Sequence, residues 1–258
     1  MTTYLDSILE QHRAVAASDP RSVDALITEA SRMLPARGFA AALRGQSTLS
    51  VIGEIKRRSP SKGDLFANLD PATIAQAYKR GGASCLSVLT DSPHFGGSVA
   101  DLQAAATACQ LPVLRKDFTV DERDVVDARI MGADCVLLIA AALDTAELRA
   151  FHDLATSVGL DVLVEIHDED ELEIALDAGA SIIGVNQRDL VTFRVDHERA
   201  VRMAGVIPGN VVKVAESGVR GRDDAQSLRS AGYHAVLVGE SLVTSTDPAA
   251  AIADLRVG

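Results

Sequence analysis

Lysine and glutamate side chains recur at the ends of short aliphatic runs along this chain. Glu54 and Lys56 close the first of these runs, Lys116 closes the third and Glu165 closes the fifth. If the ends of the runs meet in one pocket, the charges shift one another's pKa values, and such shifts separate acid roles from base roles. The set therefore predicts acid–base chemistry.

Amide, hydroxyl and glycine residues follow the last three runs, at 186–188, 216–218 and 239–241. Small residues at the last two places allow backbone N–H groups to approach an anion, and barrel enzymes often bind phosphate after strands 7 and 8. Each glycine could instead simply make a turn. Because both ends carry the same feature, the pattern favours phosphate binding at Gly218, Gly239 and Ser241.

The elements that must position these groups are eight apolar runs separated by amphipathic segments. They recur about every 26 residues, a natural length for one strand, one helix and two loops. Most are continuously apolar, as in parallel strands that are covered on both faces. The eight runs are Leu49–Ile55, Cys85–Thr90, Pro112–Lys116, Cys135–Ala140, Val162–Ile166, Ile182–Asn186, Val211–Ala215 and Ala235–Gly239.

Eight alternating units predict an α/β fold with a single (β/α)₈ TIM barrel. An open doubly wound sheet is the alternative, but the Gly-x-Gly-x-x-Gly motif that would support nucleotide binding there is absent. A charged residue at the end of a single strand is usually there only because the side chain is exposed to solvent. Six of the eight runs end in an ionisable or amide group, however, and a closed barrel would bring all of them to one mouth.

Helical spacing of apolar residues predicts helices over 121–132, 168–179 and 221–232, each ending in glycine. Before the first run, two apolar stripes indicate a helical extension packed on the barrel. We therefore expect residues 1–47 to be this extension and residues 48–258 to be the barrel, within one domain overall. The stripes consist of Leu5, Ile8, Leu9 and Val15, and of Val23, Leu26, Ile27, Ala30 and Leu34.

The composition excludes several classes of function. With 25 Lys and Arg against 36 Asp and Glu, the net charge is -11, which disfavours binding to nucleic acid or to anionic membranes. The longest apolar run, Cys135–Leu143, is too short to span a bilayer. The three cysteines have no metal-ligand spacing, so we expect reduced core thiols in a cytoplasmic protein without a targeting segment.

Several motifs resemble indole-3-glycerol-phosphate synthases. The sequence VIGEIKRRSPSKG at 51–63 is similar to the family signature, and the likeness continues in order through LPVLRKDF at 111–118, NQRDL at 186–190, AESGV at 215–219 and LVGESL at 237–242. One position departs from the family pattern, because Gln187 stands where the family usually has Asn. Since alternate side chains point to opposite faces, Gln187 should point away from Asn186 and Arg188 and alter only local hydrogen bonding.

The resemblance implies an enzyme of tryptophan biosynthesis that needs no metal and no organic cofactor. Its substrate would be a small anionic sugar phosphate, 1-(2-carboxyphenylamino)-1-deoxy-D-ribulose 5-phosphate, and the protein would be a monomer or a weak homo-oligomer. Lys116 is implied as the general acid of ring closure, and Glu165, Lys56 and Glu54 as the proton-transfer groups of the later dehydration, with their division of roles left open.

The resemblance also implies how the substrate is held. Asn186 and Ser217 are implied to position it within the catalytic group, and Lys56 to assist the phosphate loops. The remaining substrate contacts are implied for Ser59, Phe95, Phe118, Arg188, Leu190 and Glu216. The aromatic residues and the leucine could equally be core.

Two other functions stay open on the residues alone. A phosphoribosyl isomerase of the same architecture would need a different acid–base pair, commonly a carboxylate with a cysteine or with a second carboxylate. Here the first run offers Glu54 with Lys56, and no cysteine lies at the C-terminal end of a run. A non-catalytic barrel that binds a sugar phosphate would need the phosphate loops but neither the lysines nor the glutamates.

Overall fold

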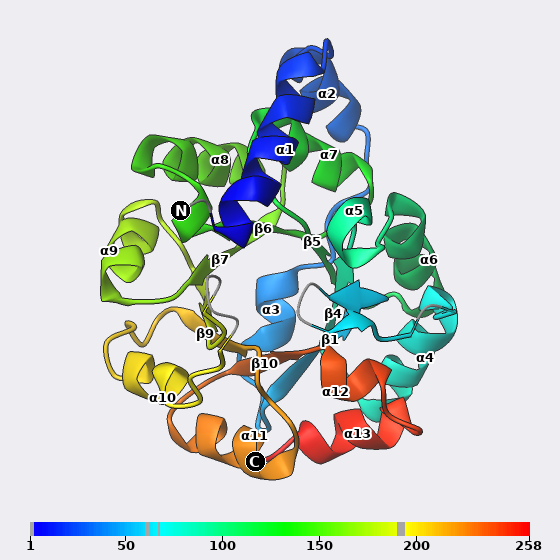
Figure 1. Ribbon diagram of the computed structural model, residues 1–258, viewed down its shortest axis with the longest axis vertical. Helices are drawn as coiled ribbons and strands as arrows, with labels where there is room; N and C mark the ends of the chain where they lie inside the picture. Colours follow the sequence, from blue (N-terminus) through cyan, green and yellow to red (C-terminus); the bar gives the residue numbers. More distant parts are fainter. Residues whose placement is uncertain (1–2, 60–61, 67, 190–193) are drawn as a thin grey trace.

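Eight parallel strands close into a barrel in which each strand pairs with the next one along the chain. This computed structural model describes residues 3–59, 62–66, 68–189 and 194–258. The barrel is seen end-on in Figure 1, with helices around the outside of the ring of strands. The predicted (β/α)₈ fold is confirmed, and the open sheet is excluded because the first and last strands pair.

The predicted runs coincide with the barrel strands to within one residue at each end. The barrel strands are β1 (Ser50–Ile55), β4 (Cys85–Leu89), β5 (Val113–Lys116), β6 (Cys135–Ile139), β7 (Asp161–Ile166), β8 (Ile182–Asn186), β9 (Val212–Glu216) and β10 (Ala235–Val238). Two short antiparallel strands, β2 (Arg58–Ser59) and β3 (Gly63–Asp64), form a separate ribbon after β1.

The helices of the described residues follow from their capping residues and apolar faces. They are α1 (Tyr4–Ser18), α2 (Val23–Ala30), α3 (Phe39–Leu43), α4 (Pro71–Gly81), α5 (Ser92–Phe95), α6 (Val99–Cys109), α7 (Glu122–Ile130), α8 (Thr145–Ser157), α9 (Glu169–Asp177), α10 (Arg199–Ala204), α11 (Arg222–Ser230), α12 (Glu240–Val243) and α13 (Pro248–Leu255), with a 3₁₀ turn at Ala140–Ala142. Asp121 and Asp168 cap two of the three predicted helices, and a left-handed glycine follows each of the three.

Apolar side chains form two layers on either side of the strands. The outer layer, which includes Val51, Val136 and Val164, packs under the helices. The inner layer fills the barrel, and Phe39 and Leu43 of α3 close it at the N-terminal ends of the strands. Burial on both faces explains why the strands read as continuous apolar runs.

The three cysteines are free and buried, as predicted. Two of them, Cys85 and Cys135, begin β4 and β6 and belong to the inner layer. Among the described residues, we find no helix with the length and apolarity needed to cross a membrane.

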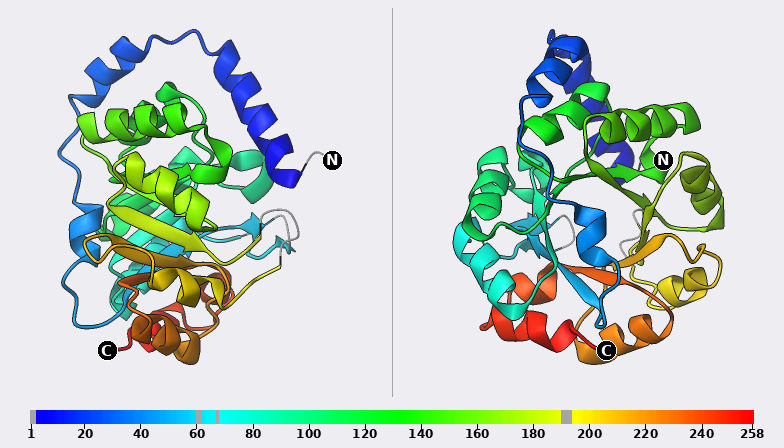
Figure 2. Two further views of the ribbon diagram at one scale, coloured as in Figure 1. Left: turned by 90° about the vertical axis from the view of Figure 1, so that its left-hand side faces the viewer. Right: turned by 180° about the vertical axis from the view of Figure 1, so that it is seen from behind.

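The segment before β1 touches both ends of the barrel. Figure 2 (left) shows the start of α1 on the side toward which the strand arrows point, and α3 on the opposite side. The two predicted stripes are wrong at one residue each. Val15 is 71% exposed because the C-terminal part of α1 turns that face to solvent, and Leu34 is 84% exposed because α2 already ends at Ala30. The division between residues 47 and 48 stays a prediction.

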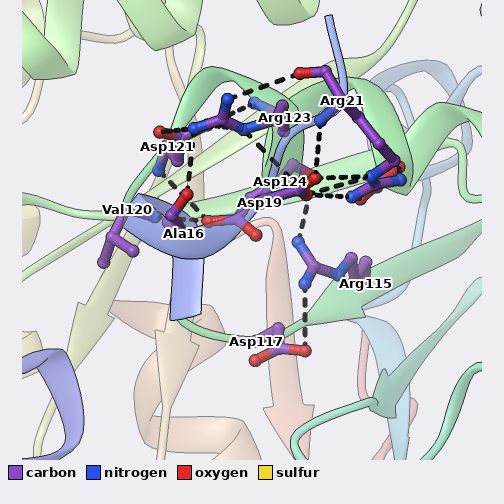
Figure 3. A network of polar contacts seen from close by, with 10 residues as sticks. Ala16, Asp19, Arg21, Arg115, Asp117, Val120, Asp121, Arg123 and Asp124 are labelled. Carbon is purple, nitrogen blue, oxygen red and sulfur yellow. Dashed lines mark hydrogen bonds and ion pairs between the residues drawn. The ribbon is translucent and has the colours of Figure 1, made fainter. Parts of the chain in front are cut away.

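Polar contacts join α1 to the helices of the barrel. Arg123 at the start of α7 donates to the carbonyl oxygen of Ala16 (3.1 Å) and pairs with Asp121 (Figure 3). Arg13 of α1 donates to Glu147 of α8 (2.8 Å). These contacts hold α1 in place even though much of its surface is exposed.

A buried carboxylate holds the chain just before α3 against the floor of the barrel. Asp134 is 2% exposed, accepts hydrogen bonds from the backbone N–H groups of Arg37 and Val113 (both 2.7 Å), and pairs with the Arg37 guanidinium at 2.6 Å. The carboxylate therefore joins the segment before α3 to β5 and β6.

We expect Asp134→Asn to lower the free energy of unfolding by about 2–3 kcal/mol, because it leaves a partly buried guanidinium unpaired and removes one acceptor. Urea denaturation measures this change. The matched substitution of an exposed aspartate, Asp153→Asn on α8, should change stability by less than about 0.5 kcal/mol. Equal effects of the two substitutions would contradict the structural role of Asp134.

Candidate active site

The inward face of the barrel changes from apolar to charged at the C-terminal ends of the strands. Side chains alternate along a strand, so the apolar inner layer continues into a polar one two residues later. Ile52 is followed by Glu54, and Leu114 by Lys116. The same step leads from Leu163 to Glu165 and from Val214 to Glu216. The predicted convergence of the strand ends is thus observed.

Lys116 lies at the centre of this polar layer. Its Nζ donates to Oε2 of Glu165 at 3.0 Å and lies 3.8 Å from Oε2 of Glu216. Asn186 donates to the other oxygen of Glu165 at 2.9 Å. Beside this group, Lys56 Nζ donates to Oε1 of Glu54 at 2.5 Å. All three glutamates are 5% exposed or less, so their charges interact with little screening.

The network drives the pKa values of its members in opposite directions. Burial alone would raise the pKa of Glu165, but Lys116, His167 and the hydrogen bond from Asn186 outweigh burial and lower it to about 2. Burial and the charge of Glu165 raise the pKa of Glu216 well above its usual range, although Lys116 opposes this shift. Burial would lower the pKa of Lys116, but the surrounding glutamates raise it above its ordinary value. The arrangement favours a charged Glu165, a protonated Glu216 and a protonated Lys116.

These groups open into one cavity of about 470 Å³ at the mouth of the barrel. Every predicted site residue within the described part of the chain lines it, and Leu190 lies outside the described residues. The predicted residues in the lining are Glu54, Lys56, Ser59, Phe95, Lys116, Phe118, Glu165, Asn186, Arg188, Glu216, Ser217, Gly218, Gly239 and Ser241.

One wall of the cavity is apolar. The rings of Phe95 and Phe118 lie 6.2 Å apart, and Tyr4, Leu5 and Ile8 of α1 also line the cavity. The contribution of α1 to the site was not predicted from the sequence. An apolar stripe shows that a helix packs on something, but it does not identify the surface on which the helix packs.

The loops after β9 and β10 lie at the opposite side of the polar layer. Ser217 and Gly218 both have left-handed backbones, with φ of 64° and 75°. A serine in this region is strained and points to a functional constraint. The Ser241 hydroxyl donates to the carbonyl oxygen of Val219 at 3.2 Å and so ties the two loops together. Successive amides in such a turn form a concavity that suits an anion.

Two glycines make room for the glutamates, and sequence analysis had assigned only one of them, to phosphate binding. A Cβ on Gly239 would lie 2.3 Å from Oε1 of Glu54, and one on Gly184 would lie 1.9 Å from Oε1 of Glu216. Gly184 was not predicted as a site residue. Its signal was a glycine at an inward position in the middle of an aliphatic strand.

The residue that departs from the family pattern supports one of these loops. Gln187 is 2% exposed, and its Nε2 donates to the carbonyl oxygen of Ser217 at 2.8 Å. The side chain does not line the cavity, whereas Asn186 and Arg188 do. Gln187 therefore points away from its two neighbours as predicted and contributes a hydrogen bond beneath the loop.

His167 is a second residue that the sequence analysis missed. Its Nδ1 lies 3.0 Å from Oε2 of Glu171, and its Nε2 lies 4.0 Å from Oε1 of Glu165. His167 follows Glu165 by two residues, so alternation alone places both side chains on one face. Its position links the start of α9 to the carboxylate that pairs with Lys116.

The loop after β1 brings two further groups to the cavity. Ser59 of β2 is buried, and its hydroxyl has no hydrogen-bond partner among the described residues. Lys62 Nζ lies 3.2 Å from Glu240 across the mouth. Within the described part of the chain, the group of three side chains that could hold a metal is His12, Asp91 and His94, which lies next to Phe118 and outside the cavity lining.

Comparison with solved structures supports the fold alone. The chain resembles 3-hexulose-6-phosphate synthase from Salmonella typhimurium with a TM-score of 0.64 at 14% identity, covering 80% of this chain and 96% of that one. It resembles thiamine phosphate pyrophosphorylase from Pyrococcus furiosus with a TM-score of 0.60 at 17% identity, covering 80% and 93%.

Comparison of sequences identifies the family. The model of indole-3-glycerol phosphate synthase matches residues 5–255. The chain is 52% identical to the indole-3-glycerol phosphate synthase of Streptomyces griseus, over 98% of this chain and 94% of that protein. It is 45% identical to that of Chlorobium phaeovibrioides, over 95% and 96%. The chain therefore belongs to the indole-3-glycerol phosphate synthase family.

Proposed function

We propose that this protein converts 1-(2-carboxyphenylamino)-1-deoxy-D-ribulose 5-phosphate into indole-3-glycerol phosphate, CO₂ and water, in tryptophan biosynthesis. The observation that carries the proposal is the position of Lys116, a partly buried cation in the cavity lining that pairs with Glu165 and also interacts with the charges of Glu216 and Glu54. Family membership agrees with it.

In the first step, the ring carbon that bears the carboxylate attacks the ketone carbon of the sugar chain and forms a carbon–carbon bond. Negative charge develops on the ketone oxygen, and Lys116 stabilises it and transfers a proton to it. The pKa of Lys116 is raised above its ordinary value, so the side chain is protonated before the reaction. An alkoxide is more basic than an ammonium group, so the transfer still runs downhill.

Loss of CO₂ returns the electron pair of the broken bond to the ring system. Dehydration then expels the new hydroxyl group as water and removes one proton next to the ring. Glu165 and Lys56 are the proposed groups for these two proton transfers, and Glu54, 2.5 Å from Lys56, tunes that lysine or accepts a proton from it. Glu216, kept neutral by burial, donates a hydrogen bond to a sugar hydroxyl.

Binding of the substrate divides between the two sides of the cavity. We assign the anthranilate ring to the apolar wall of Phe95 and Phe118, and its carboxylate to Ser59 and Arg188. Asn186 and Ser217 position the sugar hydroxyls or the carboxylate. Leu190 is assigned to the ring by resemblance alone. The phosphate is assigned to the loops at Gly218, Gly239 and Ser241, with help from Lys56.

We further propose that the enzyme acts in the cytoplasm as a monomer or a weak homo-oligomer, and that residues 1–47 and 48–258 fold as one unit. Three free buried thiols suit a reducing compartment. The ties from Arg13 to Glu147 and from Arg37 to Asp134 support a single unit.

The two rival functions are less consistent with the same residues. A phosphoribosyl isomerase that used a cysteine would need a thiol at the mouth, and Cys85 and Cys135 begin their strands at the opposite end. A barrel that only bound a sugar phosphate would have no use for a partly buried Lys116 among three buried carboxyl groups, since their burial costs desolvation energy.

We expect Lys116→Met to lower turnover by at least about two orders of magnitude, because it removes the proton donor of ring closure. Fluorescence of the indole product, followed after addition of the carboxyphenylamino-deoxyribulose phosphate, measures turnover. Lys79→Met on the exposed side of α4 is the matched control and should retain full turnover. Near-normal turnover in a folded Lys116→Met variant would remove the assignment, and no product from the unaltered enzyme would refute the proposed reaction.

The opposite pKa shifts of Glu165 and Glu216 predict opposite effects on stability. Glu216 holds its proton in the folded state at a pH where the same carboxyl group in the unfolded chain has released it. The folded state therefore loses stability as the pH rises above the pKa of that group in the unfolded chain. We expect Glu216→Gln to raise the free energy of unfolding at pH 8 by at least about 1 kcal/mol, because amide replaces a carboxyl group that is costly to ionise. The gain should shrink toward pH 4.5.

Glu165→Gln is the matched comparison. The pKa of Glu165 is lowered to about 2 in the folded state. Its charge therefore stabilises the folded state at any pH above the pKa of the same group in the unfolded chain, and this stabilisation disappears as the pH falls toward 2. We expect this variant to be less stable than the parent at pH 8. Thermal unfolding of both variants between pH 5 and pH 8 measures the effects, and a change in the same direction for both would show that the charge assignment is wrong.

A further inference from the structure

A second cluster of polar side chains joins α1 to the barrel outside the cavity. His12 Nε2 of α1 lies 3.0 Å from Oδ2 of Asp91, and His94 Nδ1 of α5 lies 3.1 Å from the same oxygen. The three donor atoms all lie within 4.8 Å of one another. Two imidazoles thus face one carboxylate oxygen from two different segments of the chain.

The backbone of α5 fixes the direction of this carboxylate. Asp91 is the N-cap of α5, and its Oδ1 accepts hydrogen bonds from the backbone N–H groups of His94 (2.7 Å) and Phe95 (3.1 Å). Because Oδ1 is used as the cap, Oδ2 is presented to the two rings. The Asp91 side chain is fully buried, whereas those of His12 and His94 are 21% and 14% exposed. The cluster is rigid on its inner side and open to solvent on the other.

We propose that His12, Asp91 and His94 bind one divalent transition-metal ion of the zinc class. Zinc bonds to imidazole nitrogen and carboxylate oxygen at about 2.0–2.2 Å, which puts neighbouring donor atoms of a tetrahedron about 3.3 Å apart. The distances from Asp91 Oδ2 to His12 Nε2 and to His94 Nδ1 are 3.0 and 3.1 Å. The outward rotation needed to admit the ion is therefore small.

The composition of the ligand set selects the kind of metal. Two nitrogen donors and one carboxylate suit zinc, cobalt or nickel, whereas magnesium and calcium prefer oxygen donors alone. The partial exposure of both imidazoles leaves room for water as a fourth ligand. Binding requires that the ion displace the hydrogen bonds that the imidazoles now make with Asp91.

An ion at this place would clamp α1 to the rim of the barrel. α1 contributes Tyr4, Leu5 and Ile8 to the cavity wall, and the His12 ring lies 5.4 Å from that of Phe118. The ion would thus hold the apolar wall, and no step of the proposed reaction passes through it. The inference stands independently of the proposed function, because neither the ligands nor the ion face the reacting groups.

Metal binding to the full-length, tag-free protein tests the proposal. Titration calorimetry with zinc chloride should give one site per chain, and cobalt chloride should give the visible absorption of a low-symmetry cobalt site. We expect His12→Gln and His94→Gln each to weaken zinc binding at least about tenfold, since each removes a direct ligand. His152→Gln on α8, a histidine outside the cluster, should bind as the unaltered protein does.

Thermal unfolding gives a second readout. Zinc should raise the midpoint temperature of unfolding of the unaltered protein and of His152→Gln. The increase should be smaller for His12→Gln and His94→Gln. If the unaltered protein shows neither one-site zinc binding nor the cobalt absorption, the cluster is a purely hydrogen-bonded tie and the proposal is wrong. Zinc binding that persists in both His12→Gln and His94→Gln would place the ion elsewhere and equally overturn it.

Discussion

The ion pair between the partly buried Lys116 and the buried Glu165 is the constraint on which the site depends. Three carboxyl groups of low exposure share two ammonium groups, Lys56 beside Glu54 and Lys116 beside Glu165 and Glu216, so only some of the carboxyl groups can be charged at once. Lys116 and Asn186 satisfy Glu165, and Glu216 is left to hold a proton. One cation thereby produces both a strong carboxylate and a neutral carboxylic acid within the same pocket, which is the separation that acid–base chemistry requires.

The barrel makes this crowding possible because its alternation is rigid. The charged layer stands on a packed apolar layer, so each glutamate is held by its own strand rather than by a loop. Space is created by omission of side chains at Gly184 and Gly239, where a single Cβ would collide with Glu216 or Glu54. The positions of Glu216 and Glu54 thus depend on the glycines beside them as well as on their ion partners.

The polar half of the site could be predicted because it depends on one local rule. Period-two alternation and continuous apolar runs give the strands to within a residue, and they place Glu54, Lys116 and Glu165 on the inward face. The apolar half could not be predicted in the same way. That α1 lines the cavity depends on tertiary contacts, and the exposure of Val15 shows that an apolar stripe need not be buried along its whole length.

The two halves of the cavity are consequently built on different principles. The reacting groups lie on strands whose hydrogen bonds fix them, whereas one wall comes from a helix held by side-chain ties at Arg13, Ala16 and His12. Loss of one of these contacts would loosen the apolar wall of the cavity and leave the lysine and its carboxylates in place. The apolar wall and the charged network can therefore change separately, because barrel strands carry Lys116, Glu165 and Glu216 whereas the contacts of α1 end on Glu147, Arg123 and Asp91.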